Sequence, residues 1–248
     1  MNIFITGSTT GIGLELARLY LKEGHRVAVS GRDLLKIPSD FKNEFPLACF
    51  YELDVCDQEK LSLAISDFSK GQLDLVIANA GISMGGKTRL PNFESWRNVF
   101  KTNIYGVINT FEPAIMIMNK QKKGYLVAIS SVAGFMGLPG TGAYSASKGA
   151  VRLFCESLSI DLKREGIFVS TICPGFIDTP LTRKNHHPMP WKMTVEEGAL
   201  RIKAAIEKKK SLYVFPLPMA MVTYVLSRVP RFIYRFLMTS KIFNYSKE

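Results

Sequence analysis

The chain has 248 residues, 47% of them hydrophobic, and carries a formal net charge of +11 at pH 7. Such a chain can bury a large core, as one α/β domain or as two smaller ones. No period of about 20–50 residues repeats, which excludes a repeat protein. The four cysteines (Cys49, Cys56, Cys155 and Cys173) show no C-x-x-C spacing and no metal-like pairing with the three histidines. This pattern favours reduced, mostly buried thiols in a cytosolic protein, and it predicts no metal site.

A strand, a glycine-rich turn and a helix open the chain. Asn2–Thr6 is strand-like and leaves no room for a signal peptide before it, whereas Leu14–Glu23 has helical apolar spacing. A turn rich in glycine allows the backbone to approach a pyrophosphate, and the helix N-terminus supplies N–H groups and the positive end of a dipole. We therefore expect the turn between them to bind a dinucleotide. Its residues are Gly7, Ser8, Thr9, Thr10, Gly11, Ile12 and Gly13.

The end of the second predicted strand, Arg26–Ser30, indicates which dinucleotide is bound. A carboxylate there would accept hydrogen bonds from the ribose 2′-hydroxyl of NAD and would repel the 2′-phosphate of NADP. Here Gly31 follows the strand, and the guanidinium of Arg32 can contact a phosphate. We expect NADP(H) to be preferred, with NAD(H) still possible because Asp33 comes next.

The third predicted strand, Leu47–Val55, ends with a carboxylate. Asp54 can accept a hydrogen bond from the adenine amino group, with Val55 beside it, or it can cap the helix predicted over residues 57–69.

The fourth predicted strand, Asp74–Ala78, runs into Asn79, Ala80 and Gly81. The small residues allow close approach of backbone and cofactor, and the Asn79 amide can brace neighbouring strands.

A long helix is predicted over Ser95–Lys120, with a kink at Pro113. Asn103 lies inside it, where an asparagine is mildly unfavourable and can simply face solvent.

Strand-like Tyr125–Ser130 and a helix over Ala143–Lys163 frame a glycine- and proline-rich loop. Tyr144 and Lys148 lie four residues apart, so one helical turn places the phenol and the ammonium on the same face. A nearby positive charge is expected to lower the pKa of the tyrosine towards the range useful for proton transfer. Ser131, at the carboxyl end of the strand, can reach the same volume.

Strands alternate with helices up to the sixth strand, Phe168–Cys173, which predicts an α/β fold with a doubly wound parallel sheet. Ligands of such sheets bind beyond the carboxyl ends of the strands. The segments at such ends are Thr6–Gly13, Gly31-Arg32, Asp54-Val55, Asn79–Gly81, Ser130-Ser131 and Pro174-Gly175.

Together these motifs resemble the short-chain dehydrogenase/reductase family in its main form of roughly 250 residues. The resemblance covers about residues 1–215 and implies one Rossmann-like NADP-binding domain with about seven strands, followed by a helical tail over 216–248. Its motifs are Thr6-Gly7-x-x-x-Gly11-Ile12-Gly13, Asn79-Ala80-Gly81, Asn103, Ser131 thirteen residues before Tyr144, Tyr144-x-x-x-Lys148, and Pro174-Gly175.

The resemblance also implies the roles of these residues. Tyr144 exchanges a proton with the substrate oxygen, Ser131 hydrogen-bonds that oxygen, and Lys148 lowers the pKa of the tyrosine and holds the ribose. Asn103 positions a water that relays protons to the lysine, and Ser130 is the minor alternative for the serine role. Residues carried over to the nicotinamide end of the cofactor are Pro174, Gly175, Ile177 and Thr179.

Residues 175–194 are, by the same resemblance, the lid that shapes substrate choice. Its apolar side chains are expected to wall a pocket for a hydrophobic carbonyl compound, whereas His186 and His187 are expected to face solvent. The wall residues are Phe176, Leu181, Met189 and Trp191. Beyond the lid, Thr194 and Glu197 are spaced as a capping box, and Leu212–Phe215 is the predicted seventh strand.

The tail carries much of the positive charge: residues 201–248 contain ten Lys or Arg and two Glu. Without a nucleic-acid-binding motif, nucleic acid is the least favoured partner. Arg228, Arg231 and Arg235 share a helical stripe opposite apolar residues, after Pro230 starts a fresh helix. Such a helix can lie in a membrane surface or can pack on the core, the lid or another subunit. The apolar residues are Val229, Phe232, Ile233, Phe236 and Leu237.

We therefore expect a cytoplasmic NADP(H)-dependent reductase of a small hydrophobic ketone or aldehyde, possible peripheral contact with a membrane, and the homodimer or homotetramer usual for the family. Two alternatives stay open: an NAD-linked alcohol dehydrogenase, and a non-catalytic protein that senses NADP(H) at a membrane.

Overall fold

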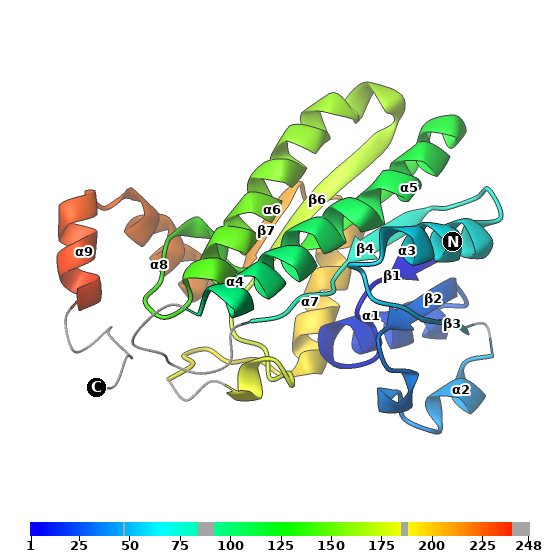
Figure 1. The fold of residues 1–248 in the computed structure, drawn as a ribbon, viewed down its shortest axis with the longest axis horizontal. Helices are drawn as coiled ribbons and strands as arrows, with labels where there is room; N and C mark the ends of the chain where they lie inside the picture. The colour runs from blue at the N-terminus through cyan, green and yellow to red at the C-terminus, as the bar shows by residue number, and fades with distance from the viewer. Residues whose placement is uncertain (47, 84–91, 185–187, 240–248) are drawn as a thin grey trace.

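The structure is a computed structural model that describes residues 1–46, 48–83, 92–184 and 188–239. Within these residues, parallel strands form one seven-stranded sheet in the order β3-β2-β1-β4-β5-β6-β7 (Figure 1). This is the predicted doubly wound sheet. The strands are β1 (Asn2–Ile5), β2 (Arg26–Gly31), β3 (Ala48–Glu52), β4 (Leu75–Ala78), β5 (Gly124–Ile129), β6 (Ile167–Pro174) and β7 (Leu212–Phe215).

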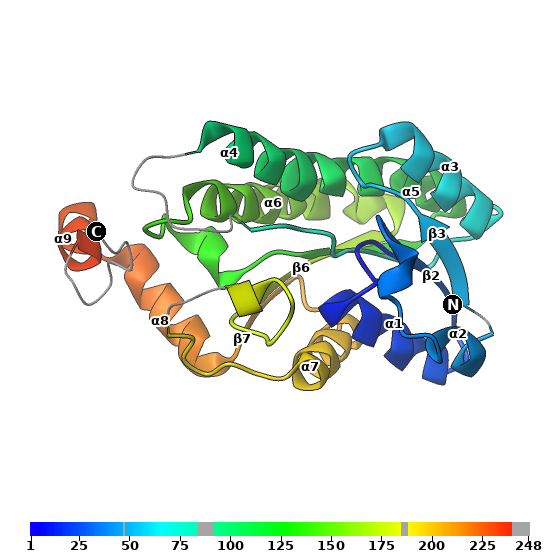
Figure 2. The same cartoon turned by 60° about the horizontal axis from the view of Figure 1, so that its bottom comes forward.

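Helices cover both faces of the sheet, as Figure 2 shows: α1, α2 and α7 lie on one face, and α3 to α6 lie on the other. The α-helices of the described residues are α1 (Gly11–Lys22), α2 (Phe41–Glu44), α3 (Gln58–Ser69), α4 (Phe93–Phe100), α5 (Gly106–Gln121), α6 (Gly142–Asp161), α7 (Val195–Glu207), α8 (Leu217–Arg228) and α9 (Arg231–Thr239).

The core is divided by the sheet into two layers, because successive side chains of a strand point to opposite faces. In β1, Ile3 and Ile5 pack with Leu16 of α1, whereas Phe4 packs into the layer beneath α3 and α5. Both layers are fully apolar along the central strands, as expected of a parallel sheet covered on both sides. The core therefore holds the strand ends in fixed register.

The strand order reverses at β1, which lies between β2 and β4. The connections leaving β1 and β4 run to opposite sides there, so the carboxyl ends of the two strands flank a crevice. Such a reversal is where open α/β sheets bind their ligands.

The predicted long helix is interrupted. Lys101–Tyr105 forms a π-helical segment between α4 and α5, whereas Pro113 lies inside regular α5. The helix continues through Pro113 to Gln121, and the kink expected at that proline stays a prediction. The π-helical segment contains Asn103, which is fully buried and does not face solvent.

Two predictions about helix capping have different outcomes. The α3 helix is capped by Asp57, whose side chain accepts a hydrogen bond from the Lys60 N–H, so the capping role considered for Asp54 was wrong. The capping box is confirmed: the Thr194 and Glu197 side chains each bond the other residue's backbone N–H at the start of α7.

The described part of the tail is helical, with α8 and α9 forming one end of the molecule (Figure 1). A new helix follows Pro230, as predicted. No helix of the described residues is long and apolar enough to span a bilayer.

Candidate active site

A cleft with a cavity volume of about 270 Å³ lies at the carboxyl ends of the strands. Its walls come from segments far apart in the sequence, which the sheet brings together. Predicted cofactor residues that line it are Gly7, Thr9, Thr10, Gly11, Ile12, Arg32, Asp54, Val55, Asn79, Ala80, Gly81, Tyr144, Lys148, Pro174, Gly175, Ile177 and Thr179.

The glycine turn packs tightly on the end of β4. Gly7 has a φ of +62°, and a Cβ there would lie 2.7 Å from Ala80 Cα. The Asn79 amide donates to the carbonyl oxygens of Thr6 and Gly7, each at 2.9 Å. The turn is thus held in the open, side-chain-free form that a phosphate needs.

Ser8 and Gly13 support this turn from below and do not line the cleft. The Ser8 hydroxyl donates to the Ile5 carbonyl at 2.7 Å and accepts from the Ser30 N–H at 2.8 Å. A Cβ on Gly13 would lie 2.5 Å from both the Asn79 amide nitrogen and the Gly7 oxygen.

The N-terminus of α1 opens towards the cleft. In the described structure, its N-cap Thr10 makes no side-chain capping bond, and no acidic residue occupies the first turn. The first N–H groups and the positive dipole end are thus available to an anion such as a pyrophosphate. The glycine cradle and this helix terminus together fit a dinucleotide cofactor.

Arg32 stands at one rim of the cleft, at the end of β2. A Cβ on the preceding Gly31 would lie 2.7 Å from the Thr9 Cγ2, so no acidic side chain fits there without displacing Thr9. The Asp33 carboxylate caps the following 3₁₀ turn by accepting from the Leu35 N–H at 3.0 Å, and it lies 3.3 Å from the Lys36 ammonium. Lys36 also lines the cleft, and sequence reasoning missed it. A second basic residue four positions after Arg32 was the available signal.

Asp54 lines the cleft just beyond β3, the strand paired with β2, and its carboxylate accepts a hydrogen bond from the Cys56 N–H at 2.9 Å. One of its oxygens is thereby oriented by the chain itself, and the carboxylate remains part of the cleft wall.

Ser131 and Tyr144 both line the cleft, and the Ser131 side chain lies near enough to the Tyr144 phenol to lower its pKa. The Ser131 hydroxyl is oriented by the Ala133 N–H, which donates to it at 3.1 Å. Ser130 is engaged elsewhere: its hydroxyl donates to the Lys148 carbonyl at 2.8 Å and thereby joins β5 to α6. The geometry therefore separates the two competing serines.

Lys148 is buried beside Tyr144, with its ammonium 5.9 Å from the centre of the phenol ring and 2.7 Å from the Ile129 carbonyl oxygen. Burial lowers the pKa of Lys148 to about 8. Burial also raises the pKa of Tyr144, and the Ser131 side chain opposes this only in part. The predicted lowering of the Tyr144 pKa was therefore wrong, because desolvation of the phenolate is the largest influence on it.

Asn103 braces the floor of the cleft from behind. Its side-chain oxygen accepts from the Ile82 N–H at 2.8 Å, and its amide donates to the Ile82 carbonyl at 2.9 Å and to the Ser147 hydroxyl at 3.0 Å. The side chain thus joins the segment after β4 to α6, next to Lys148.

The predicted substrate wall is only partly assembled. Leu181 lines the cleft, but Phe176, Met189 and Trp191 are not among its lining residues. The Trp191 side chain is 50% exposed. Both His186 and His187 lie outside the described residues. Lining residues that sequence reasoning did not name include Ile82, Thr102, Pro180 and Thr182.

All four cysteines are free thiols, two of them buried, and the described residues contain no group of three or more His, Cys, Asp or Glu side chains that could hold a metal ion.

Known proteins are similar to this chain in sequence and in fold. The family model for short chain dehydrogenases matches residues 1–190. An uncharacterised oxidoreductase of Myxococcus xanthus is 36% identical over 235 residues, with 91% of each chain covered. A putative ketoacyl reductase of Streptomyces coelicolor is 34% identical, covering 90% of this chain and 88% of its own. The solved structure of ElxO with NADP bound superposes with a TM-score of 0.77 at 27% identity, covering 86% of this chain and 96% of its own. This chain belongs to the short-chain dehydrogenase family of NAD(P)-dependent oxidoreductases.

Proposed function

We propose that this chain is an NADP(H)-dependent oxidoreductase that reduces a hydrophobic ketone or aldehyde. The observation that carries the proposal is the meeting of Ser131, Tyr144 and Lys148 at the floor of the cleft that the glycine turn opens. The putative ketoacyl reductase among the relatives also acts, by its name, on a ketone.

The glycine turn and Arg32 would hold NADPH in this cleft, where the cofactor would supply the hydride that reduces a carbonyl carbon. Tyr144 gives its hydroxyl proton to the carbonyl oxygen, and the Ser131 hydroxyl hydrogen-bonds the same oxygen and stabilises the charge that develops on it. Lys148 places a positive charge beside the phenolate that remains after proton transfer. Asn103 holds the surrounding segments in place, and its water-relay role stays a prediction.

Burial raises the pKa of Tyr144, so at neutral pH the phenol carries the proton that it would donate to a substrate oxygen. The same side chain would act as the base in the reverse reaction. An NAD-linked alcohol dehydrogenase therefore stays the alternative function.

The preference for NADP(H) is supported by the rim around Arg32. Asp33, the residue that most favoured NAD(H), is occupied with the Leu35 N–H and Lys36. Arg32 and Lys36 place two positive charges where a 2′-phosphate can be bound. The ElxO structure, by its title, contains NADP.

The test of the catalytic proposal is Tyr144→Phe. We expect loss of NADPH consumption across a panel of hydrophobic ketones and aldehydes, by about a hundredfold or more for removal of a general acid, with NADPH binding retained in a fluorescence titration. If the variant turns substrate over like the unmodified chain, Tyr144 is not the acid. A non-catalytic NADP(H) sensor predicts no turnover by either protein and unchanged binding.

The test of the cofactor proposal is Arg32→Ala. Loss of a charge-assisted hydrogen bond is expected to weaken NADPH binding by about tenfold or more and to leave NADH binding unchanged. Glu52→Ala, at the end of neighbouring β3, serves as a control. An unchanged preference for NADPH over NADH in the Arg32 variant would remove the phosphate assignment.

We propose that the chain acts in the cytoplasm as a homodimer or homotetramer. Apolar side chains exposed on the helices that carry the site support pairing there: Tyr105, Met116, Leu153 and Ile160. We also propose peripheral membrane contact through the tail.

A further inference from the structure

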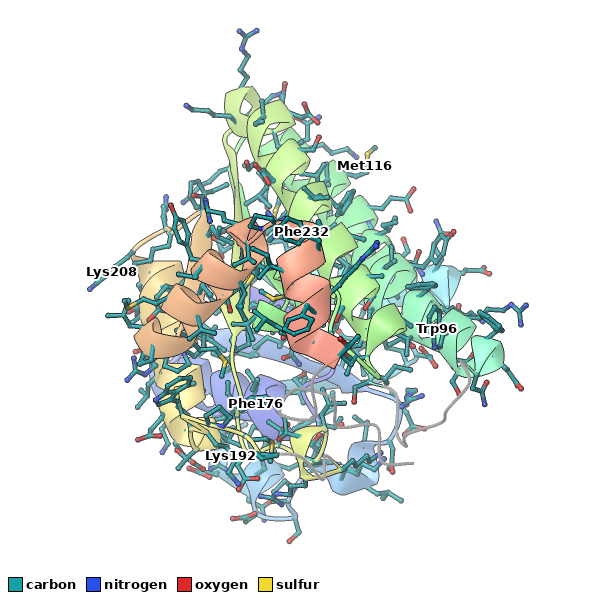
Figure 3. The ribbon with its side chains drawn as sticks, turned by 90° about the vertical axis from the view of Figure 1, so that its left-hand side faces the viewer. Trp96, Met116, Phe176, Lys192, Lys208 and Phe232 are labelled. Atoms are coloured by element: carbon teal, nitrogen blue, oxygen red, sulfur yellow. The ribbon has the colours of Figure 1, made fainter. Side chains whose placement is uncertain are left out.

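The two tail helices turn apolar side chains away from the protein. Phe232 and Phe236 of α9 are 75% and 77% exposed, and Met221 and Tyr224 of α8 are also largely exposed. Figure 3 views this end of the molecule, with α8 and α9 in front and Phe232 on α9. We define the tail surface as Leu217, Met221, Tyr224, Val225, Phe232, Ile233 and Phe236.

The orientation of α9 is set by what it buries. Tyr234 and Met238 pack against Met136, and the Tyr234 hydroxyl donates to the Gly137 carbonyl at 2.5 Å. At 100° per residue, this contact directs Phe232 and Phe236 to the opposite side of the helix. Their exposure therefore follows from the packing of α9 on the loop between Ser131 and Tyr144, called the catalytic loop below.

The charge around the tail surface has a single sign. Residues 211–239 contain three arginines (Arg228, Arg231 and Arg235) and no Lys, Asp or Glu. Arg231 and Arg235 flank the exposed phenylalanines of α9, and the Arg228 guanidinium lies 3.4 Å from the centre of the Tyr224 ring. Apolar side chains edged by arginines match a lipid surface that has acyl chains below and anionic headgroups above.

We propose that the tail surface docks on an anionic lipid bilayer, with the phenylalanines in the acyl boundary and the three arginines among the headgroup phosphates. A second copy of the chain is a poorer occupant. In a two-fold pairing the same patch meets itself, which would bring the arginines of both copies together.

Docking in this way brings the catalytic loop to the membrane. Gly137 lies between Ser131 and Tyr144 in sequence and is hydrogen-bonded to Tyr234 on the inner side of α9. A second cavity, of about 470 Å³, lies between α9 and residues 137–139, lined by Arg231, Arg235 and Met238 among others. The bilayer would then carry the hydrophobic carbonyl substrate to the enzyme. This part of the proposal rests on the proposed function, since it assumes the reductase reaction.

The experiment is co-sedimentation of the full chain with vesicles of phosphatidylcholine alone or mixed with phosphatidylserine, at low and high salt. The first variant is Phe232→Ser with Phe236→Ser, and the second is Arg231→Gln with Arg235→Gln. Leu63→Ser on α3, at the other end of the molecule (Figure 1), is the matched control because Leu63 is 64% exposed.

We expect binding to the mixed vesicles that salt weakens, reduced about tenfold or more by either double substitution and unchanged by Leu63→Ser. Tyr144→Phe should bind vesicles normally even if the proposed reaction is wrong, so the two proposals fail separately. Equal sedimentation of the phenylalanine variant and the unmodified chain would overturn the docking surface. A second result would also overturn it: gel filtration shows that the unmodified chain forms an oligomer, the phenylalanine variant does not, and neither protein binds vesicles.

Discussion

Replacing Lys148 by methionine is expected to stabilise the fold while removing a proposed catalytic group. The lysine is buried, and burial lowers its pKa from 10.5 to about 8. A pKa difference of about 2.5 units corresponds to about 3 kcal/mol against the charged folded form. Methionine removes this cost but loses the hydrogen bond to the Ile129 carbonyl, which contributes about 1 kcal/mol. The net gain in the free energy of unfolding at pH 7 is about 2 kcal/mol.

The gain has a defined pH dependence. The folded pKa of Lys148 lies below the unfolded one, so between pH 8 and pH 10.5 the unfolded chain binds more protons than the folded chain. Stability of the unmodified protein therefore rises with pH across this window, and the penalty is present in full below it. The advantage of the methionine variant should shrink by about 2.5 kcal/mol between pH 7 and pH 10.

The measurement is urea unfolding of both proteins at pH 7 and pH 10, without cofactor because a ligand that binds the folded state adds its own stabilisation. Lys203→Met is the control. Lys203 is ion-paired with Glu23 and Glu207, and its pKa is raised, so its stabilisation is present below pH 10.5 and this variant should lose stability at both pH values. The reasoning would be refuted if the Lys148→Met variant were no more stable than the unmodified protein at pH 7 and the difference in their free energies of unfolding were the same at pH 10.

Two further predictions concern the glycine turn and the two serines. Gly7→Ala should cost about 1–3 kcal/mol of stability and weaken NADPH binding, because it puts a Cβ at a φ of +62° and 2.7 Å from Ala80 Cα. Thermal unfolding measures the loss of stability, and titration with NADPH measures the loss of binding. An unchanged melting temperature would contradict the close packing of Gly7 on Ala80. Ser131→Ala should lower kcat by about a hundredfold. Ser130→Ala should instead lower stability by about 1–3 kcal/mol because it leaves the buried Lys148 carbonyl without its hydroxyl donor. If steady-state kinetics and unfolding show that Ser130→Ala loses activity and Ser131→Ala loses only stability, the two serines have each other's role.

Much of the cleft could be predicted from sequence because a parallel sheet brings strand ends together. Gly7, Arg32, Asp54 and Asn79 each lie at or just beyond the carboxyl end of a separate predicted strand, and all four line the same cleft. Predicting this juxtaposition needs only the strand boundaries and the rule that ligands bind at carboxyl ends. The small errors in strand boundaries did not matter, since the site lies beyond the strands.

Properties that depend on burial could not be predicted in this way. The spacing of Tyr144 and Lys148 predicts a shared helix face, but the direction of the Tyr144 pKa depends on desolvation, which only the packed structure gives. Asn103 was expected to tolerate solvent, yet it is fully buried and satisfied by Ile82 and Ser147. In both cases the neighbours that decide the outcome are distant in sequence.

The tail shows a third kind of limit. Its periodicity separated arginines from apolar residues but could not show which side contacts the protein. The contact is made by Tyr234 and Met238, between the two sets, which leaves the predicted apolar side chains Phe232 and Phe236 exposed. A hydrophobic stripe alone therefore does not identify the buried face of a helix.

The site at Lys148 carries a cost that the fold does not need. A buried ammonium with a pKa near 8 destabilises the folded state at neutral pH, and Gly81 lies against it, since a Cβ there would be 3.3 Å from the lysine nitrogen. Packing alone would favour an apolar side chain at this position, because it would remove the desolvation penalty. In the mechanism proposed above, this charge stabilises the phenolate of Tyr144 at the moment of proton transfer. On that proposal, stability and activity should change in opposite directions when Lys148 is replaced.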